Sequence, residues 1–152
     1  MKKIILISIL VFVLFVGTGI FIQLQQQKTE KFEFPKPSEV VKKYFESWNK
    51  KNWVEMYSTI SDGFKKIEPT AKTLSDFREY AISQNTGNIG ILSINEKSND
   101  GKTAVVEYSV EFTFSDGSKN KFTNSFTLKH RDGDIIRGWK LIHPYGDKID
   151  TL

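Results

Sequence analysis

The chain begins with a long uncharged apolar stretch. Residues 4–22, IILISILVFVLFVGTGIFI, form an uncharged run of 19 residues that follows Lys2 and Lys3. As a helix this run rises about 28 Å, close to the roughly 30 Å hydrocarbon core of a bilayer. The two lysines favour a tail held in the cytoplasm. We therefore predict a cytoplasmic tip and single transmembrane anchor over residues 1–24, with the following domain outside the cytoplasm.

A secretory signal peptide is the alternative for the same segment. Gly17 and Gly19 resemble a small-x-small cleavage site, and cleavage there would release a secreted domain. Residues 20–22 continue the apolar run beyond this site, which favours an uncleaved anchor. The next segment, QLQQQKTEKFEFPKP, is polar and holds two prolines. Because proline discourages helix in the residue before it, we predict a polar tether over residues 25–37.

Two apolar stripes at helical spacing follow the tether. The first consists of Val41, Tyr44, Phe45 and Trp48, and the second of Trp53, Met56, Tyr57 and Ile60. Both fall at i, i+3, i+4 and i+7, the spacing of one helix face. Ser38 is placed to cap the first helix, and Asn52 with Glu55 has capping-box spacing for the second. We expect the second helix to end near residues 62–63.

A third helix is predicted after residue 72. Thr73 is placed at its start, and Asp76 supports the first turn. Phe77 and Tyr80 provide its apolar face, and Gly87 is expected to end it. The three helical patterns therefore lie together in the N-terminal half of the domain.

The apolar period changes from helix to strand after these helices. In TAVVEYSVEFTF, residues 103–114, inward and outward positions alternate, as in a half-buried strand with one wet face. Asp-Gly pairs, which favour hairpin turns, occur at regular intervals of 16 residues. They stand at 100–101, 116–117 and 132–133. Three turns predict four consecutive strands, at roughly 90–98, 102–115, 119–131 and 135–143.

Helices followed by an antiparallel meander predict an α+β domain over residues 38–152. About three N-terminal helices should pack on one face of the four-stranded sheet. The two central strands approach about 40 Å at 3.3 Å per residue, so the sheet should twist and curve. A strongly curved sheet closed by helices has the shape of a cone.

Composition and charge exclude several classes of protein. Hydrophobic residues make up 39% of the chain and aromatic residues 13%, which is enough to build a core. The net charge is +4, and lysine pairs alternate with glutamates instead of forming a basic stripe, so we expect no nucleic-acid partner. The chain has no cysteine, which excludes disulfides, thiolate metal sites and a lipid-modified cysteine.

Three segments resemble a known family. They are PSEVVKKYFESWNKKNWVEMYSTISDGF (37–64), LSDFREY (74–80) and GWKLIHP (138–144). Their pattern of an aromatic helix, a polar break, W-x-x-M-Y, a Ser-Asp helix start and a late Trp is similar to the NTF2-like domain of certain membrane-anchored penicillin-binding transpeptidases. More broadly, it resembles the NTF2-like, cystatin-like superfamily. The resemblance implies an extracytoplasmic accessory domain, but the transpeptidase serine motifs are absent from this sequence, so it implies no cell-wall enzymology.

Candidate acid–base residues are few on the predicted inner face of the sheet. The second strand offers Tyr108 and no carboxylate there, since Glu107 and Glu111 fall on the wet face. His130 is the sharpest remaining candidate, because an imidazole can act as a base, although its place beside a turn favours a rim position. The weaker candidates are Asn124, Tyr57 and Asp76. For Asp76 we favour a helix-capping role over a catalytic one. His143 and His130 lack metal-ligand spacing, so we predict no catalytic residue, metal or cofactor.

The aromatic residues allow two interpretations. They are a packing surface between helices and sheet, which the apolar spacing favours, or the lining of an apolar pocket. The candidate lining residues are Trp48, Tyr57, Phe77, Tyr80, Tyr108, Phe112, Phe126, His130 and Trp139.

The leading hypothesis from the sequence is a membrane-anchored, extracytoplasmic accessory or interaction domain of the cell envelope, without enzymatic activity. Its partners would be the membrane, through residues 4–22, and envelope proteins or a small ligand. The alternatives are a small apolar ligand-binding domain, a scaffold subunit of a secretion or conjugation system, and an enzyme that uses His130.

Overall fold

The computed structural model describes residues 33–144. The chain divides into two units, residues 1–33 and 34–152, and the fold below is that of the second. The anchor over residues 1–24, residues 25–32 of the tether and residues 145–152 lie outside the described residues, so the domain boundaries stay a prediction. Within residues 33–144 no helix has the length and hydropathy needed to cross a bilayer.

Within residues 33–144, four α-helices and one 3-10 helix precede four strands. The helices are α2 (Pro37–Asn49), α3 (Trp53–Ser58), α4 (Asp62–Ile67), η1 (Pro69–Ala71) and α5 (Leu74–Ser83). The strands are β1 (Thr86–Asn99), β2 (Thr103–Phe114), β3 (Lys119–Arg131) and β4 (Gly138–Leu141). This order confirms the predicted α+β class, with one more short α-helix than expected.

Helix α2 starts at Pro37, two residues earlier than a cap at Ser38 predicts. Pro37 occupies the first turn, where its fixed φ suits a helix, and Lys36 takes the cap position in place of Ser38. The Lys36 backbone N–H donates to Glu39 Oε2 at 2.8 Å, so a glutamate closes the helix start. The predicted Ser38 cap is wrong because Pro37 and Glu39 together define an earlier boundary.

The second predicted helix is divided in two. Asn52 does cap α3, since its Oδ1 accepts from Glu55 N at 3.2 Å, but α3 ends at Ser58. The backbone at residues 59–61 leaves the helix to pair with β4: Leu141 N donates to Thr59 O, and Ser61 N donates to Leu141 O, both at 2.9 Å. Residues 62–63, the predicted end, instead begin α4.

Helix α5 confirms the predicted start and corrects the predicted end. Thr73 Oγ1 accepts from Asp76 N at 3.1 Å, and Asp76 Oδ2 accepts from Thr73 N at 3.1 Å. The helix ends at Ser83, and Asn85 turns the chain with a φ of 51°. Gly87 therefore lies inside β1 and does not end the helix.

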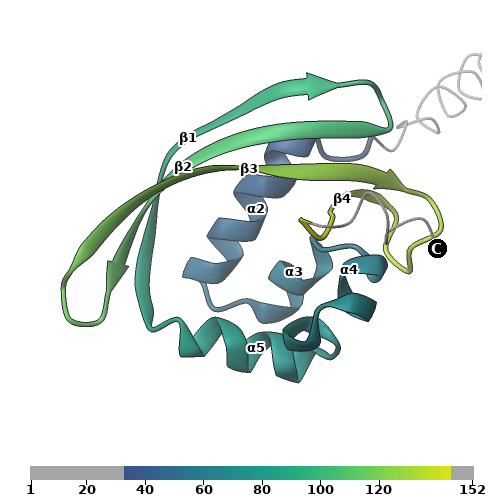
Figure 1. The fold of residues 1–152 in the computed structure, drawn as a ribbon. Helices are drawn as coiled ribbons and strands as arrows, with labels where there is room; N and C mark the ends of the chain where they lie inside the picture. The colour runs from purple at the N-terminus through teal and green to yellow at the C-terminus, as the bar shows by residue number, and fades with distance from the viewer. Residues whose placement is uncertain (1–32, 145–152) are drawn as a thin grey trace, which may run out of the picture. The chain divides into compact units, whose positions relative to one another are not determined.

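The sheet is an antiparallel meander in the order β1-β2-β3-β4. Directly paired residues such as Tyr108 and Asn124, or Val106 and Phe126, share a face, which confirms the predicted inward positions of β2 and β3. Register shifts occur at three points between β1 and β2, and such irregularities increase local twist. The sheet curves around the helices, which cover its concave side (Figure 1).

The third Asp-Gly pair does not form a tight hairpin. Strand β4 covers only residues 138–141 and is shorter than the predicted 135–143, because residues 132–137 form a longer loop. Asp134 points inward from this loop and accepts from Arg131 Nε at 3.1 Å and from Asp62 N at 3.0 Å. Asp62 in turn accepts from Ile135 N at 2.8 Å, so the loop is fastened to α4 by two aspartates.

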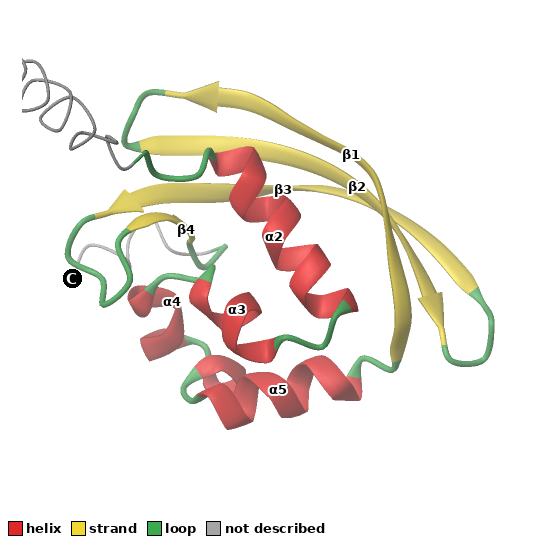
Figure 2. Cartoon of the chain, turned by 180° about the vertical axis from the view of Figure 1, so that it is seen from behind, coloured by secondary structure: helices red, strands yellow, loops and turns green. Residues whose placement is uncertain are grey.

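One core fills the space between the helices and the concave face. It consists of Val40, Val41, Phe45, Met56, Ile60, Ala71, Phe77, Ile89, Val106, Tyr108, Val110, Leu128 and Leu141. The β2–β3 hairpin extends past α2 and α5 on one side (Figure 2), and residues 119–125 of β3 are exposed. Helix packing therefore covers one half of β3 and leaves the other half open.

Candidate functional site

An aromatic cavity of about 320 Å³ lies where the β2–β3 hairpin extends beyond the helices. Helices α2 and α5 form one wall, and the inward positions of β2 and β3 form the other. The lining residues are Tyr44, Phe45, Trp48, Tyr80, Gln84, Tyr108, Phe112, Phe114, Asn120, Phe122 and Phe126. Nine of these eleven residues are aromatic, and none is a carboxylate, an imidazole or a cation. We name this space the aromatic cavity.

Ring contacts fix the floor of the aromatic cavity. Tyr108 stacks on Phe126 with ring centroids 4.6 Å apart, and Phe45 supports Tyr108 from α2 at 5.0 Å. Tyr44 meets Phe126 edge-on at 5.7 Å. Such offset and edge-to-face pairs are the favoured arrangements of aromatic rings. The floor is therefore built from the same side chains that hold the helices to the sheet.

Toward its opening the aromatic cavity has exposed aromatic side chains. Phe122 is 44% exposed and Tyr80 is 42% exposed, although both are large apolar side chains. Phe122 lies within 6.3 Å of the Tyr108 ring, on the hairpin that projects past the helices. Apolar surface left open beside a cavity is typical of a ligand-binding surface.

Three tyrosines give the cavity its polar character. Burial raises the pKa of Tyr44 above its usual range, and the adjacent Tyr80 and Tyr108 raise it further. Burial also raises the pKa of Tyr108, to about 12. The phenols of Tyr44 and Tyr108 are therefore uncharged at neutral pH and act as hydrogen-bond donors and acceptors, not as bases.

A second cavity of about 370 Å³ adjoins the first and shares Tyr44, Tyr80 and Phe126 with it. At its far end His143 Nε2 lies 3.3 Å from Glu68 Oε2. Hydrogen bonds from Thr70, followed by the neighbouring His143, lower the pKa of Glu68. An imidazole held by a carboxylate is an arrangement that can transfer protons. Here it belongs to the second cavity and is absent from the aromatic one.

The structure brings together most of the residues predicted as pocket lining. Trp48, Tyr80, Tyr108, Phe112 and Phe126 all surround the aromatic cavity. Phe77 lines the second cavity and is otherwise buried in the core.

The other three predicted lining residues lie elsewhere. The Tyr57 hydroxyl donates to Ala71 O at 2.9 Å, and its ring packs behind Phe77 at 5.4 Å. His130 and Trp139 contact each other at 5.5 Å, and neither lines either cavity. His130 Nδ1 is 3.3 Å from Asp132, on the loop after β3. Its place beside this loop, away from the tyrosines, gives it no part in the aromatic cavity.

Several lining residues were not among the predicted set. Tyr44 belongs to the apolar stripe of α2, and inward alternation on β3 already gives Phe122 the correct face. Gln84 and Asn120 carry no signal in the sequence, because their position depends on how far the hairpin extends past α5. Among the residues that the structure describes, no three His, Asp or Glu side chains gather in a way that could hold a metal ion.

No family model matches the sequence, and no curated protein matches it. Solved structures do resemble the chain. A SEC-C motif containing protein from Rhodopseudomonas palustris has a TM-score of 0.51 at 9% identity, covering 72% of this chain and 79% of the other.

Two further solved structures carry the NTF2-like description. An NTF2-like protein of unknown function from Burkholderia pseudomallei K96243 has a TM-score of 0.45 at 11% identity, covering 71% of this chain and 89% of the other. A protein described as an NTF2-like transpeptidase from Campylobacter jejuni has a TM-score of 0.44 at 16% identity, covering 72% and 99%. Identities this low concern the fold alone. Both structures carry the description of the superfamily that the sequence segments resemble.

Proposed function

We propose that this domain binds a small, flat, uncharged aromatic molecule in the aromatic cavity and performs no reaction on it. The observation that carries the proposal is the cavity of about 320 Å³ with nine aromatic residues in its wall. That volume lies within the usual range for small-molecule sites, roughly 300–1,000 Å³.

The polar groups of the cavity define the ligand further. Phenols and side-chain amides can each donate one or more hydrogen bonds, so the ligand carries acceptor oxygens or nitrogens at its edge. No charged group lines the cavity, and a buried ion without a partner would be costly. The ligand is therefore neutral.

The same lining supports the proposal that no reaction takes place in the aromatic cavity. General acid–base catalysis needs a group whose pKa lies near the working pH, and the pKa values of Tyr44 and Tyr108 are shifted away from it. Turnover of a cavity ligand that disappears in His143→Ala while binding persists would contradict this part of the proposal.

We further propose that residues 4–22 anchor this domain to the outer side of a membrane, as an accessory module of the cell envelope. The support is the uncharged 19-residue run behind Lys2 and Lys3. Protease added to intact cells should digest residues 34–152 and spare the cytoplasmic tip. Protection of the domain until the cells are lysed would contradict the topology.

Cavity binding predicts a specific pattern among variants. Equilibrium dialysis of the full chain in detergent with 2-naphthol, a neutral flat aromatic, should give saturable binding. Tyr108→Ala removes a ring from the floor, and Phe122→Ala removes one from the opening. Each truncation should weaken binding about tenfold, because an aromatic ring that a bound ligand covers contributes about 1.4 kcal/mol or more.

His130→Ala is the matched control, since His130 lies outside the cavity. It should change binding less than twofold. Equal weakening by His130→Ala and Tyr108→Ala, or unsaturable uptake equal to that of empty micelles, would contradict the proposal.

A further inference from the structure

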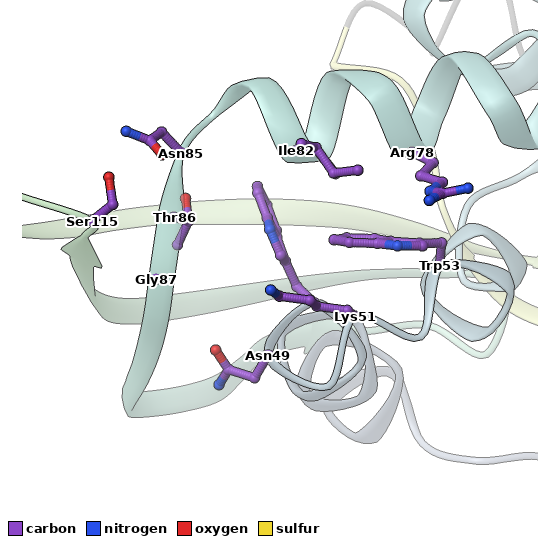
Figure 3. A pocket seen from close by; sticks show the side chains of 11 residues that line it. Asn49, Lys51, Trp53, Arg78, Ile82, Asn85, Thr86, Gly87 and Ser115 are labelled. Carbon is purple, nitrogen blue, oxygen red and sulfur yellow. The ribbon is translucent and has the colours of Figure 1, made fainter.

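A separate groove lies on the other side of Trp48 from the aromatic cavity. Two adjoining depressions of about 420 and 430 Å³ share Lys51, Trp53 and Arg78. They run between the α2–α3 connection on one side and α5 with the start of β1 on the other. Figure 3 shows Arg78 and Ile82 projecting from α5 toward Trp53. We name this depression the α5 groove.

The α5 groove follows the whole length of its helix. Leu74, Ser75, Arg78 and Ile82 all line it, at the i, i+1, i+4 and i+8 positions of one helix face. The ten residues of α5 rise about 15 Å, which equals four to five residues of an extended chain. A short linear segment therefore matches the groove in length.

The charge of the α5 groove has one sign. Lys51 and Arg78 both line it, and no Asp or Glu does. Within residues 33–144 neither cation forms an ion pair, whereas Glu55, on the neighbouring α3, is engaged by Lys43 Nζ at 3.0 Å. Two unpaired cations in a concave surface attract carboxylates.

Apolar side chains are exposed along the same groove. Val54 is 66% exposed, Ile82 is 54% exposed and Leu74 is 37% exposed. Trp53 lies between them and lines both depressions. Indole surfaces beside open apolar groups are typical of the anchor points of protein interfaces.

The backbone on both sides of the groove is strained. Lys51 has a φ of 54° and Asn85 a φ of 51°, and they are the two non-glycine residues with positive φ among residues 33–144. Both line the groove. Such conformations cost about 1–3 kcal/mol each and concentrate at functional surfaces. Their occurrence on opposite walls is a second observation, independent of charge, that marks the groove.

The groove is also held in place before any partner binds. The Asn49 side chain donates to Ile89 O and accepts from Ile89 N, each at 2.7 Å. This amide fastens the end of α2 to the outer edge of β1. A wall fixed in this way loses little conformational entropy on binding.

From these features we propose that the α5 groove binds a short extended peptide of a partner protein that carries both apolar side chains and Asp or Glu. Each wall of the groove offers one cation beside one apolar side chain, Arg78 with Ile82 on α5 and Lys51 with Trp53 opposite, so carboxylates and apolar groups of the peptide find partners on both sides. The concave shape and the presence of only two cations fit a peptide better than a membrane surface or a nucleic acid. This proposal does not depend on the ligand of the aromatic cavity.

Selection from a phage-displayed library of random heptapeptides tests the proposal on the full chain in detergent. Enriched peptides should combine apolar residues with Asp or Glu. The best peptide, measured by fluorescence anisotropy, should bind the Lys51→Ala/Arg78→Ala double variant at least about tenfold more weakly, because each charge-assisted contact contributes about 1.5 kcal/mol or more. Replacing its Asp and Glu by Asn and Gln should have an equal effect.

Two controls make the outcome specific. Lys42→Ala/Lys97→Ala removes two exposed cations that lie outside the groove, and should leave peptide affinity within about twofold. Tyr108→Ala should also retain it, so failure of cavity binding and failure of groove binding are distinguishable.

Three results would overturn the proposal. The first is a library selection that enriches no peptide, and the second is enrichment of basic or uncharged peptides. The third is a best peptide that binds the Lys51→Ala/Arg78→Ala variant as tightly as the parent chain. Self-association of the parent chain that disappears in Lys51→Ala/Arg78→Ala, measured by sedimentation, would likewise replace the peptide by a second copy of the chain.

Discussion

Phe45→Ala should lower the free energy of unfolding by about 4 kcal/mol, the largest loss expected from a single substitution in the described fold. Phe45 is 2% exposed and touches the rings of Tyr44, Tyr108 and Phe126, with centroids 5.3, 5.0 and 6.1 Å away. Alanine would remove the ring that joins α2 to the centre of the sheet and leave a cavity behind it. Urea denaturation of the full chain, followed by near-UV circular dichroism, measures the loss.

Phe122→Ala is the control for this experiment. The same chemical change on the projecting hairpin removes a side chain that is 44% exposed, so we expect a loss below about 1 kcal/mol. The two variants separate packing from binding, since Phe122 lines the aromatic cavity without holding the core together. Losses of similar size in both variants would contradict the position assigned to Phe45.

Asp134→Ala should cost about 3 kcal/mol, the second largest effect. The Asp134 side chain is 4% exposed and accepts from Arg131 Nε and from Asp62 N. Removing it leaves a buried N–H without its acceptor and takes a negative charge from beside the buried Lys140, whose pKa burial already lowers. Breaking a buried charge pair from one side typically costs 3–5 kcal/mol. Thermal unfolding of the full chain should shift down by about 10 °C.

Asp132→Ala, two residues away on the same loop, is its matched control. Asp132 is 80% exposed, so its removal should change the unfolding free energy by less than about 0.5 kcal/mol. A loss in Asp134→Ala no larger than in Asp132→Ala would show that the loop is not fastened by the buried carboxylate.

Local signals in the sequence predict most of this fold. The apolar spacing of residues 41–48 identifies α2, the Thr73 and Asp76 pair identifies the start of α5, and alternation in residues 103–114 gives the correct inner face of β2. These features depend on neighbouring residues only. A sequence read in short windows therefore recovers them.

The errors arise where a distant partner decides the structure. Residues 59–61 leave the helix because they pair with Leu141, and residues 132–137 form a loop because Asp134 meets Asp62. The sequence predicts that Gly87 ends the third helix, but Asn85 turns the chain two residues earlier. Each correction involves either a contact between segments far apart in the chain or a backbone conformation that the residue type does not dictate.

The residues of the candidate sites also divide into those that local patterns predict and those whose contacts depend on distant segments. The sequence predicts five of the residues around the aromatic cavity, three of them (Tyr108, Phe112 and Phe126) from inward alternation on β2 and β3, yet whether they enclose space or fill it depends on the length of the hairpin beyond α5. Glu68 and His143 are 75 residues apart, and no spacing predicts their contact. Lys51 and Arg78 likewise read as solvated surface residues until α3 and α5 are placed side by side.

Trp48 offers the most direct test of the central claim, because it lines the aromatic cavity while Trp53 and Trp139 do not. A full chain carrying Trp53→Phe and Trp139→Phe leaves Trp48 as its sole tryptophan. A neutral brominated ligand, 6-bromo-2-naphthol, quenches tryptophan by heavy-atom contact and can be compared with unbrominated 2-naphthol. We predict saturable extra quenching of Trp48 by the brominated compound, weakened by Phe122→Ala because Phe122 lines the aromatic cavity and not the α5 groove, and no extra quenching in the matched chain that keeps only Trp139. Equal quenching of both tryptophans, or quenching of Trp48 that does not saturate, would contradict ligand binding in the aromatic cavity.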